Sequence, residues 1–61
     1  MLRIKEVLKL KNIKQQQLAD QLGVSKVTVS YWCNNQTNPS LVTLKQISII
    51  LKVKITDLIK D

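Results

Sequence analysis

The stretch QLADQLGVSKVTVSYWCNN, residues 17–35, decides the fold, because two helical apolar patterns meet there at the only glycine of the chain. Apolar residues three and four positions apart share one face of a helix. Before Gly23 this face is formed by Leu18, Ala19 and Leu22, and after it by Val29, Trp32 and Cys33. Gly23 suits the left-handed residue that ends a helix, and Ser25 can accept a backbone N–H at the start of the next. The stretch therefore predicts two short helices joined by a tight turn.

The same helical spacing continues on both sides of this stretch. Before the stretch, one inward-facing apolar stripe is formed by Ile4, Val7, Leu8 and Leu10. After it, a second stripe is formed by Leu41, Leu44, Ile47, Ser48 and Leu51, and a third by Ile55, Leu58 and Ile59. Asn34-Asn35 can end a helix in a left-handed turn, Asn38-Pro39 favours an extended linker, and Ser40 can cap the helix that follows. The run KVKIT at 52–56 alternates like a strand, but it is short and is interpreted as a helix–helix connection. The sequence predicts a compact all-α domain of five short helices.

Length and composition limit the classes of function. A chain of 61 residues forms one domain at most, expected to span 1–61, and buries only about 60% of its unfolded surface. With no histidine and one cysteine, no zinc site or internal disulfide is expected, and no cofactor or small-molecule ligand is indicated. The four carboxylates are scattered and there is no glycine-rich phosphate loop, so an enzyme is not expected. No signal peptide or membrane-spanning run is visible, so a cytoplasmic protein is expected.

The formal charge of +6 is distributed unevenly. Residues 1–14 carry +4, residues 15–40 carry zero, and residues 41–61 carry +2. A basic chain suits a polyanion such as nucleic acid, although the same charge also serves solubility. Since the central segment is almost neutral, any recognition by it must rely on shape and hydrogen bonds.

The predicted helix 25–34 turns unusual residues toward water. At about 100° per residue, Trp32 and Cys33 point inward with Val29, while Val27, Tyr31 and Asn34 point outward. This arrangement fits a helix-turn-helix, whose second helix enters the major groove by its N-terminal half. There lysine can donate to guanine, valine can contact a thymine methyl, and tyrosine can reach a base edge or a phosphate. A pair of scattered exposed residues is the alternative interpretation.

These motifs resemble the Cro and phage-repressor type of helix-turn-helix protein, the Xre family. The family pattern of a glutamine, Leu-Ala and Leu-Gly-Val-Ser is matched by QQQLADQLGVS at 15–25 and continues as KVTVSYWCNN at 26–35. Its later parts are matched by QTNPSLVTL at 36–44 and LKVKITDL at 51–58. The resemblance covers essentially the whole chain. It implies a lambda-repressor-like DNA-binding domain with its helix-turn-helix unit at about 15–34.

The resemblance also implies roles for individual residues. Base reading falls on Lys26, Val27 and Tyr31, with Thr28 and Ser30 as secondary contacts. Phosphate binding falls on Gln15, Lys14, Asn34 and the helix start at Ser40. Four residues depart from the family pattern: Lys14 replaces a Ser or Thr cap, Tyr31 an arginine, Cys33 a glutamate and Asn35 a glycine. The base preference is therefore expected to differ from that of typical members.

Several other residues have ordinary structural interpretations. Trp32 is assigned to the core, and Cys33 to a small buried hydrophobe rather than a redox sensor. A solvated face of the first helix, with phosphate contact as the alternative, is assigned to Lys5, Lys9 and Lys11. The excess of isoleucine at 49, 50 and 59 is explained either by packing of the C-terminal helix or by a two-fold interface.

The function expected is a sequence-specific regulator that binds double-stranded DNA as a homodimer on a pseudo-palindromic site and represses by occlusion. An antitoxin, a restriction-modification controller and a domain of a longer protein are alternatives that share this chemistry. A membrane-surface or partner-binding helical protein is a different class, suggested by the basic amphipathic segment RIKEVLKLKN at 3–12. That segment lacks an aromatic anchor, so we expect no membrane association.

Overall fold

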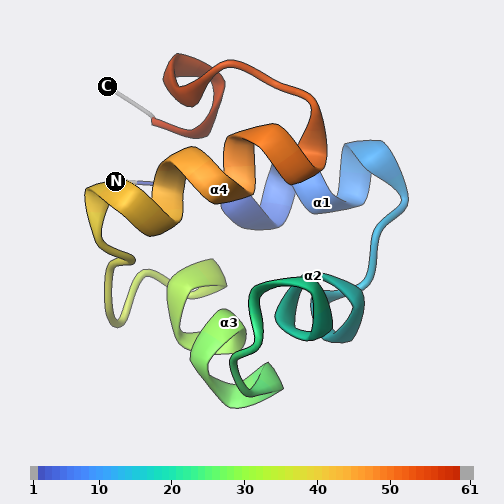
Figure 1. Ribbon diagram of the computed structural model, residues 1–61, viewed down its shortest axis with the longest axis vertical. Coiled ribbons are helices and arrows are strands. Elements are labelled where there is room, and N and C mark those ends of the chain that lie inside the picture. Colours follow the sequence, from blue (N-terminus) through green and yellow to red (C-terminus); the bar gives the residue numbers. More distant parts are fainter. Residues whose placement is uncertain (1, 60–61) are drawn as a thin grey trace.

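The helices follow one another with short connections, as the computed structural model shows for residues 2–59 (Figure 1). The elements are α1 (Ile4–Lys11), α2 (Gln15–Leu22), α3 (Lys26–Cys33), α4 (Leu41–Leu51) and a 3-10 helix, η1 (Ile55–Leu58). The first residue and the last two of the expected domain 1–61 lie outside the described residues. The described part of the chain is all-helical, apart from one isolated antiparallel bridge between Leu2 and Ile59.

The expected fifth helix is a single 3-10 turn, so the prediction of five α-helices was only partly correct. The turn is held at its start by the N–H of Lys54, which donates to Oδ2 of Asp57 at 3.1 Å. It ends because Ile59 adopts an extended conformation and pairs with Leu2. The pairing is reinforced by the N–H of Arg3, which donates to the carbonyl of Leu58 at 2.8 Å. The last apolar residues therefore close the domain by pairing with its N-terminal segment.

Most helix ends carry the residues that the sequence offered. Ser25 and Ser40 cap α3 and α4, accepting the N–H groups of Thr28 at 3.1 Å and Thr43 at 3.2 Å. Gly23 ends α2 with a φ of 72°. The left-handed region is also occupied by three non-glycine residues at helix ends, Asn12, Asn35 and Lys52. Of these, only Asn35 was expected from the sequence.

Helix α2 begins without a side-chain cap, as the lysine at position 14 suggested. The backbone N–H of Lys14 instead donates to Oε1 of Gln17 at 2.8 Å. This bond satisfies one backbone group at the start of the helix and leaves the lysine side chain exposed. The start of α2 is thus fixed by a glutamine one turn into the helix.

The core lies where α1, α2, α3 and α4 converge, with η1 packed against α1 and α4. In Figure 1, α4 crosses in front of α1, and α2 and α3 lie together below them. The apolar residues with less than a tenth of their surface exposed are Ile4, Val7, Leu8, Leu18, Ala19, Val29, Trp32, Cys33, Leu44, Ile47, Leu51 and Leu58. Burial of each large side chain contributes about 1.5–3 kcal/mol, which makes this cluster the main source of stability.

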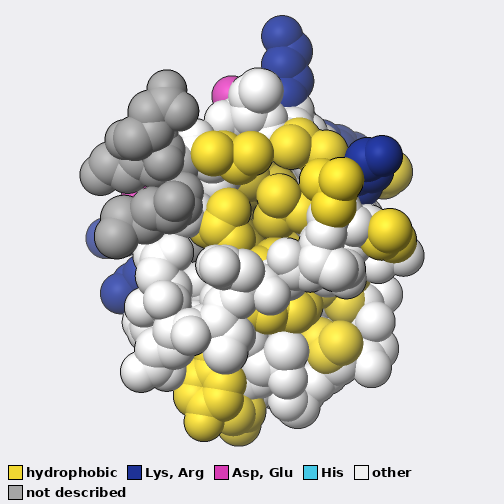
Figure 2. Space-filling model, turned by 90° about the vertical axis from the view of Figure 1, so that its left-hand side faces the viewer, with side chains coloured by type: hydrophobic (Ala, Val, Ile, Leu, Met, Phe, Trp, Pro, Cys, Tyr) yellow, Lys and Arg dark blue, Asp and Glu magenta, His cyan; other side chains and the backbone are white. Residues whose placement is uncertain are grey.

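Some residues assigned to the inward stripes lie outside the core. Leu10 is 80% exposed, and Leu41 and Ile59 are also exposed, so their assignment to the buried stripes was wrong. Ile50 packs against the core, whereas Ile49 is 75% exposed. The face in Figure 2 carries a patch of hydrophobic side chains with basic side chains at its margins. It includes the end of α4 that begins with Leu41 and Val42, both exposed.

The longest helix, α4, has 11 residues. None of the helices within residues 2–59 combines the length and the apolar character that crossing a lipid bilayer requires.

Candidate nucleic-acid interface

Helix α3 is anchored by one face and open on the other. Trp32 is only 6% exposed, and Val29 and Cys33 are buried beside it. On the opposite face, Val27 is 57% exposed and Tyr31 is 46% exposed. The helical periodicity of residues 25–34 therefore predicted the orientation of this helix correctly. An aliphatic and an aromatic side chain are thus exposed one helical turn apart on α3, the helix at the lower edge of the molecule in Figure 1.

The polar residues of α3 differ in their exposure and in whether their side chains already have hydrogen-bond partners. Lys26 is exposed at the first helical position. Thr28 is half-buried, and its Oγ1 lies 2.9 Å from Oγ of Ser25, within the cap of the helix. Ser30 is also half-buried, and its Oγ accepts from Nδ2 of Asn34 at 3.5 Å. The accessible side chains are thus those of Lys26, Val27 and Tyr31, while the hydroxyls of Thr28 and Ser30 have partners within the helix.

The residues expected at phosphate fall into two groups. Lys14 and Gln15 lie at the start of α2, on the rim of a groove that Lys26 also lines. Asn34 and Ser40 belong to the connection between α3 and α4 and do not line this groove. The Oγ of Ser40 holds the N–H of Thr43, so its hydroxyl serves first as a helix cap. The structure brings the first group together with one of the base-reading candidates.

The groove has a volume of about 510 Å³ and is bounded by α1, the start of α2 and the start of α3. Its floor includes Leu8 and Ile13, and Lys5 and Lys9 line it from α1. Both lysines were expected on a solvated face of the first helix, with phosphate contact as the alternative. The signal that could have found the groove is their spacing of four residues, which sets both side chains on one face of a helix.

The only cysteine is a core residue. Burial raises the pKa of the Cys33 thiol, an effect that nearby Glu6 strengthens and that the positive charge of Lys5 opposes. The thiol is therefore kept protonated in the folded chain, where it packs as a small apolar group behind α3.

Comparison with known proteins gives three findings. The family model described as Helix-turn-helix matches residues 4–58. The HTH-type transcriptional activator BcrR of Enterococcus faecalis is 41% identical over 49 residues, which are 80% of this chain. The chain spans about a quarter of the length of that relative, 24%. The crystal structure of a candidate DNA-binding protein from Bacteroides fragilis is 40% identical and superimposes with a TM-score of 0.97, over 98% of this chain and 97% of the other.

Proposed function

The chain belongs to the Xre-type helix-turn-helix family of DNA-binding transcriptional regulators, and from this premise we propose that it reads a specific double-stranded DNA sequence in the major groove with α3. The proposal assigns the helix-turn-helix unit to residues 15–34, within one domain spanning 1–61. The observation that carries it is the pair Val27 and Tyr31, exposed on the face of α3 opposite the buried Trp32.

The outer face of α3 has little charge, so specificity must come from shape and from short-range contacts. Val27 fits against the C5 methyl group of a thymine, and the Tyr31 hydroxyl can bond to a base edge or a phosphate. Lys26, at the N-terminal end of the helix, can donate to O6 and N7 of a guanine. Thr28 and Ser30 make secondary contacts in this proposal, because reaching DNA would require their hydroxyls to exchange partners within the helix. Gln15, Lys14, Asn34 and the start of α4 at Ser40 hold the phosphates on either side.

A second copy of the chain is part of this proposal. The longest principal extent of the molecule is 26 Å, whereas half-sites of a pseudo-palindrome lie about 34–36 Å apart. One copy is therefore too short to read both half-sites. A homodimer would place one α3 in each of two successive turns of the major groove.

Repression by occlusion is the regulatory output that we propose, since a dimer seated on a promoter excludes other proteins from the same groove. The second candidate output is activation, favoured by the similarity to a protein named as a transcriptional activator. An operator placed over a promoter and one placed upstream of it distinguish these outputs in a reporter assay. Repression only from the overlapping site supports occlusion, and a gain in transcription from the upstream site supports activation. An antitoxin or a restriction-modification controller would use the same DNA contacts, and neighbouring genes would identify either one.

The experiment that tests DNA reading is a selection on random duplexes with the purified chain. We expect an enriched motif with two-fold symmetry whose half-sites are separated by about one turn of DNA. Selection without enrichment of any motif would contradict sequence-specific reading. Enrichment of a single, unsymmetrical half-site would contradict the homodimer alone.

A further inference from the structure

We propose that the groove between α1 and the helix-turn-helix unit is a binding site for backbone phosphates, with Lys5 and Lys9 of α1 as its main contacts. The inference rests on the proposed function, because the phosphates belong to the duplex that α3 reads. It extends the DNA contact surface to a helix outside the helix-turn-helix unit.

The first observation is the convergence of positive charge from three segments of the chain. Lys5 and Lys9 come from α1, Lys14 from the start of α2, and Lys26 from the start of α3. All four side chains are exposed, and no acidic residue of the described chain lines the groove. The carboxylates nearest in sequence have other partners, since Glu6 pairs with Arg3 at 3.9 Å and Asp20 accepts from Gln16 at 2.7 Å. The groove is thus a concave surface with positive charge that the protein itself does not neutralise.

The second observation is the position of the groove relative to α3. Lys26 is both a wall of the groove and the first residue of α3. A duplex that receives the N-terminal half of α3 must therefore carry its backbone past the mouth of the groove. Gln15 and Gln16 lie on the same rim and offer neutral hydrogen-bond donors beside the lysines. The phosphates that fit there flank the bases that α3 reads.

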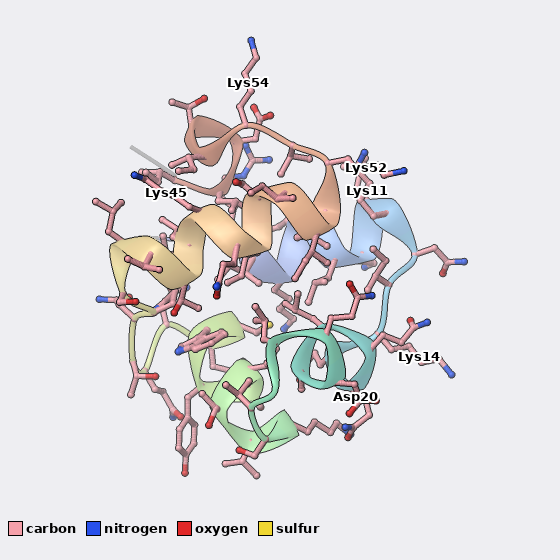
Figure 3. All side chains as sticks on the ribbon, viewed as in Figure 1. Lys11, Lys14, Asp20, Lys45, Lys52 and Lys54 are labelled. Carbon is pink, nitrogen blue, oxygen red and sulfur yellow. The ribbon has the colours of Figure 1, made fainter. Side chains whose placement is uncertain are left out.

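The remaining basic residues show that this arrangement is local. In Figure 3, Lys54 lies at the top of the molecule and Lys52 at its right-hand side beside Lys11, both above α2 and α3, whereas Lys14 projects from the start of α2. Removing the charges of Lys5 and Lys9 lowers the net charge by the same amount as removing those of Lys52 and Lys54. Only the groove pair is placed to release counterions from DNA, so the two pairs provide a matched comparison.

The experiment measures the salt dependence of binding to the selected duplex for three proteins. These are the wild-type chain, the double variant Lys5→Gln/Lys9→Gln and the control Lys52→Gln/Lys54→Gln. We expect the groove variant to lower the slope of log K against log salt by about 1.8 for each copy of the chain bound, and so by about 3.6 for a dimer, because each lost phosphate contact removes about 0.9. The control is expected to keep the wild-type slope, and all three should select the same motif.

Two further measurements separate the possible failures. Lys5→Arg/Lys9→Arg keeps the charge and should restore the wild-type slope, which excludes a loss caused by misfolding. Trimming the duplex at the end nearest the groove should abolish the difference between the wild type and the groove variant. Equal slopes for the groove variant and the control would overturn this inference while leaving reading by α3 intact. A wild-type chain that binds no duplex would overturn the proposed function itself.

Discussion

The side chain of Asn35 joins the end of α3 to the N-terminal segment, because its Oδ1 accepts the backbone N–H of Leu2 at 3.0 Å. The same residue adopts a φ of 58°, in the left-handed region. It therefore meets two demands at once, a left-handed backbone conformation and a side-chain oxygen that accepts the hydrogen bond. Glycine would satisfy the backbone conformation but not the hydrogen bond, and alanine would satisfy neither.

We expect Asn35→Ala to lower the free energy of unfolding by about 1–2 kcal/mol, because it combines a strained left-handed residue with the lost hydrogen bond. Asn35→Gly should change it by less than about 0.5 kcal/mol, since relief of strain offsets the lost bond. Urea unfolding of the two variants beside the wild type measures both values. Equal destabilisation by the two substitutions would show that the Leu2 contact, and not the backbone conformation, governs this position.

Gly23 offers a simpler test of the left-handed turn between α2 and α3. Its φ is 72°, and a Cβ added there would meet no atom within 4 Å. The cost of Gly23→Ala is therefore conformational alone, about 1 kcal/mol, which lowers the Tm of a domain of this size by about 4–8 °C. Gly23→Asn should lose less, because asparagine tolerates this region better. Thermal unfolding followed by circular dichroism measures the Tm of the wild type, Gly23→Asn and Gly23→Ala, which should decrease in that order.

The two exposed side chains of α3 should control base preference. We expect Val27→Ala and Tyr31→Ala to change the motif recovered from random duplexes, with a loss of about 1–3 kcal/mol for the preferred base at the affected positions. Neither substitution removes a charge, so the salt dependence of binding should stay the same. Recovery of the wild-type motif by both variants would show that these side chains do not face the bases.

Gln15 should act on affinity without acting on sequence preference. Its neutral side chain, half-buried at the start of α2, can donate a hydrogen bond to a phosphate, worth about 1.5–3 kcal/mol to a charged acceptor. We expect Gln15→Ala to weaken binding to all duplexes by a similar factor and to leave the slope against salt unchanged. Titration of the preferred duplex and of one with an altered motif tests this. A loss confined to one of the two would assign Gln15 to base reading.

The buried thiol should make stability depend on alkaline pH. Because the pKa of Cys33 is raised in the folded chain, the unfolded chain releases the thiol proton first as the pH rises. The protonated thiol contributes its full stabilisation of the folded chain below the ordinary pKa of a thiol, about 8.5. This contribution is lost as the pH rises through the raised pKa of Cys33 in the folded chain. We expect the difference in unfolding free energy between the wild type and Cys33→Ala to shrink over this range. The two chains differ only at position 33, so a constant difference would show that the thiol ionises equally in the folded and unfolded states.

The sequence predicted the turn after α2 and the position and orientation of α3 well because both depend on local chemistry. Gly23 has no side chain and therefore suits the left-handed end of α2, and the hydroxyls of Ser25 and Ser40 suit the N-cap positions of α3 and α4. The opposed faces of Trp32 and Tyr31 follow from helical geometry alone. These features need no knowledge of the rest of the chain.

The parts that sequence reasoning missed depend on tertiary placement. Leu10 lies three residues after the buried Val7, but in the last turn of α1 only the face that carries Leu8 is covered by the core, and Leu10 lies outside that face. Phosphate contact was an alternative for Lys5 and Lys9, but the sequence did not predict that they line one groove with Lys14 and Lys26. The expected fifth helix became a 3-10 turn because Ile59 pairs with Leu2, a contact between opposite ends of the sequence.

The bridge between Leu2 and Ile59 has a practical consequence for tethering. It brings the two ends of the described chain to one side of the molecule, at the upper left in Figure 1. A fluorophore, a surface linker or a fused protein attached at either end of the described chain would therefore extend from the same side of the molecule.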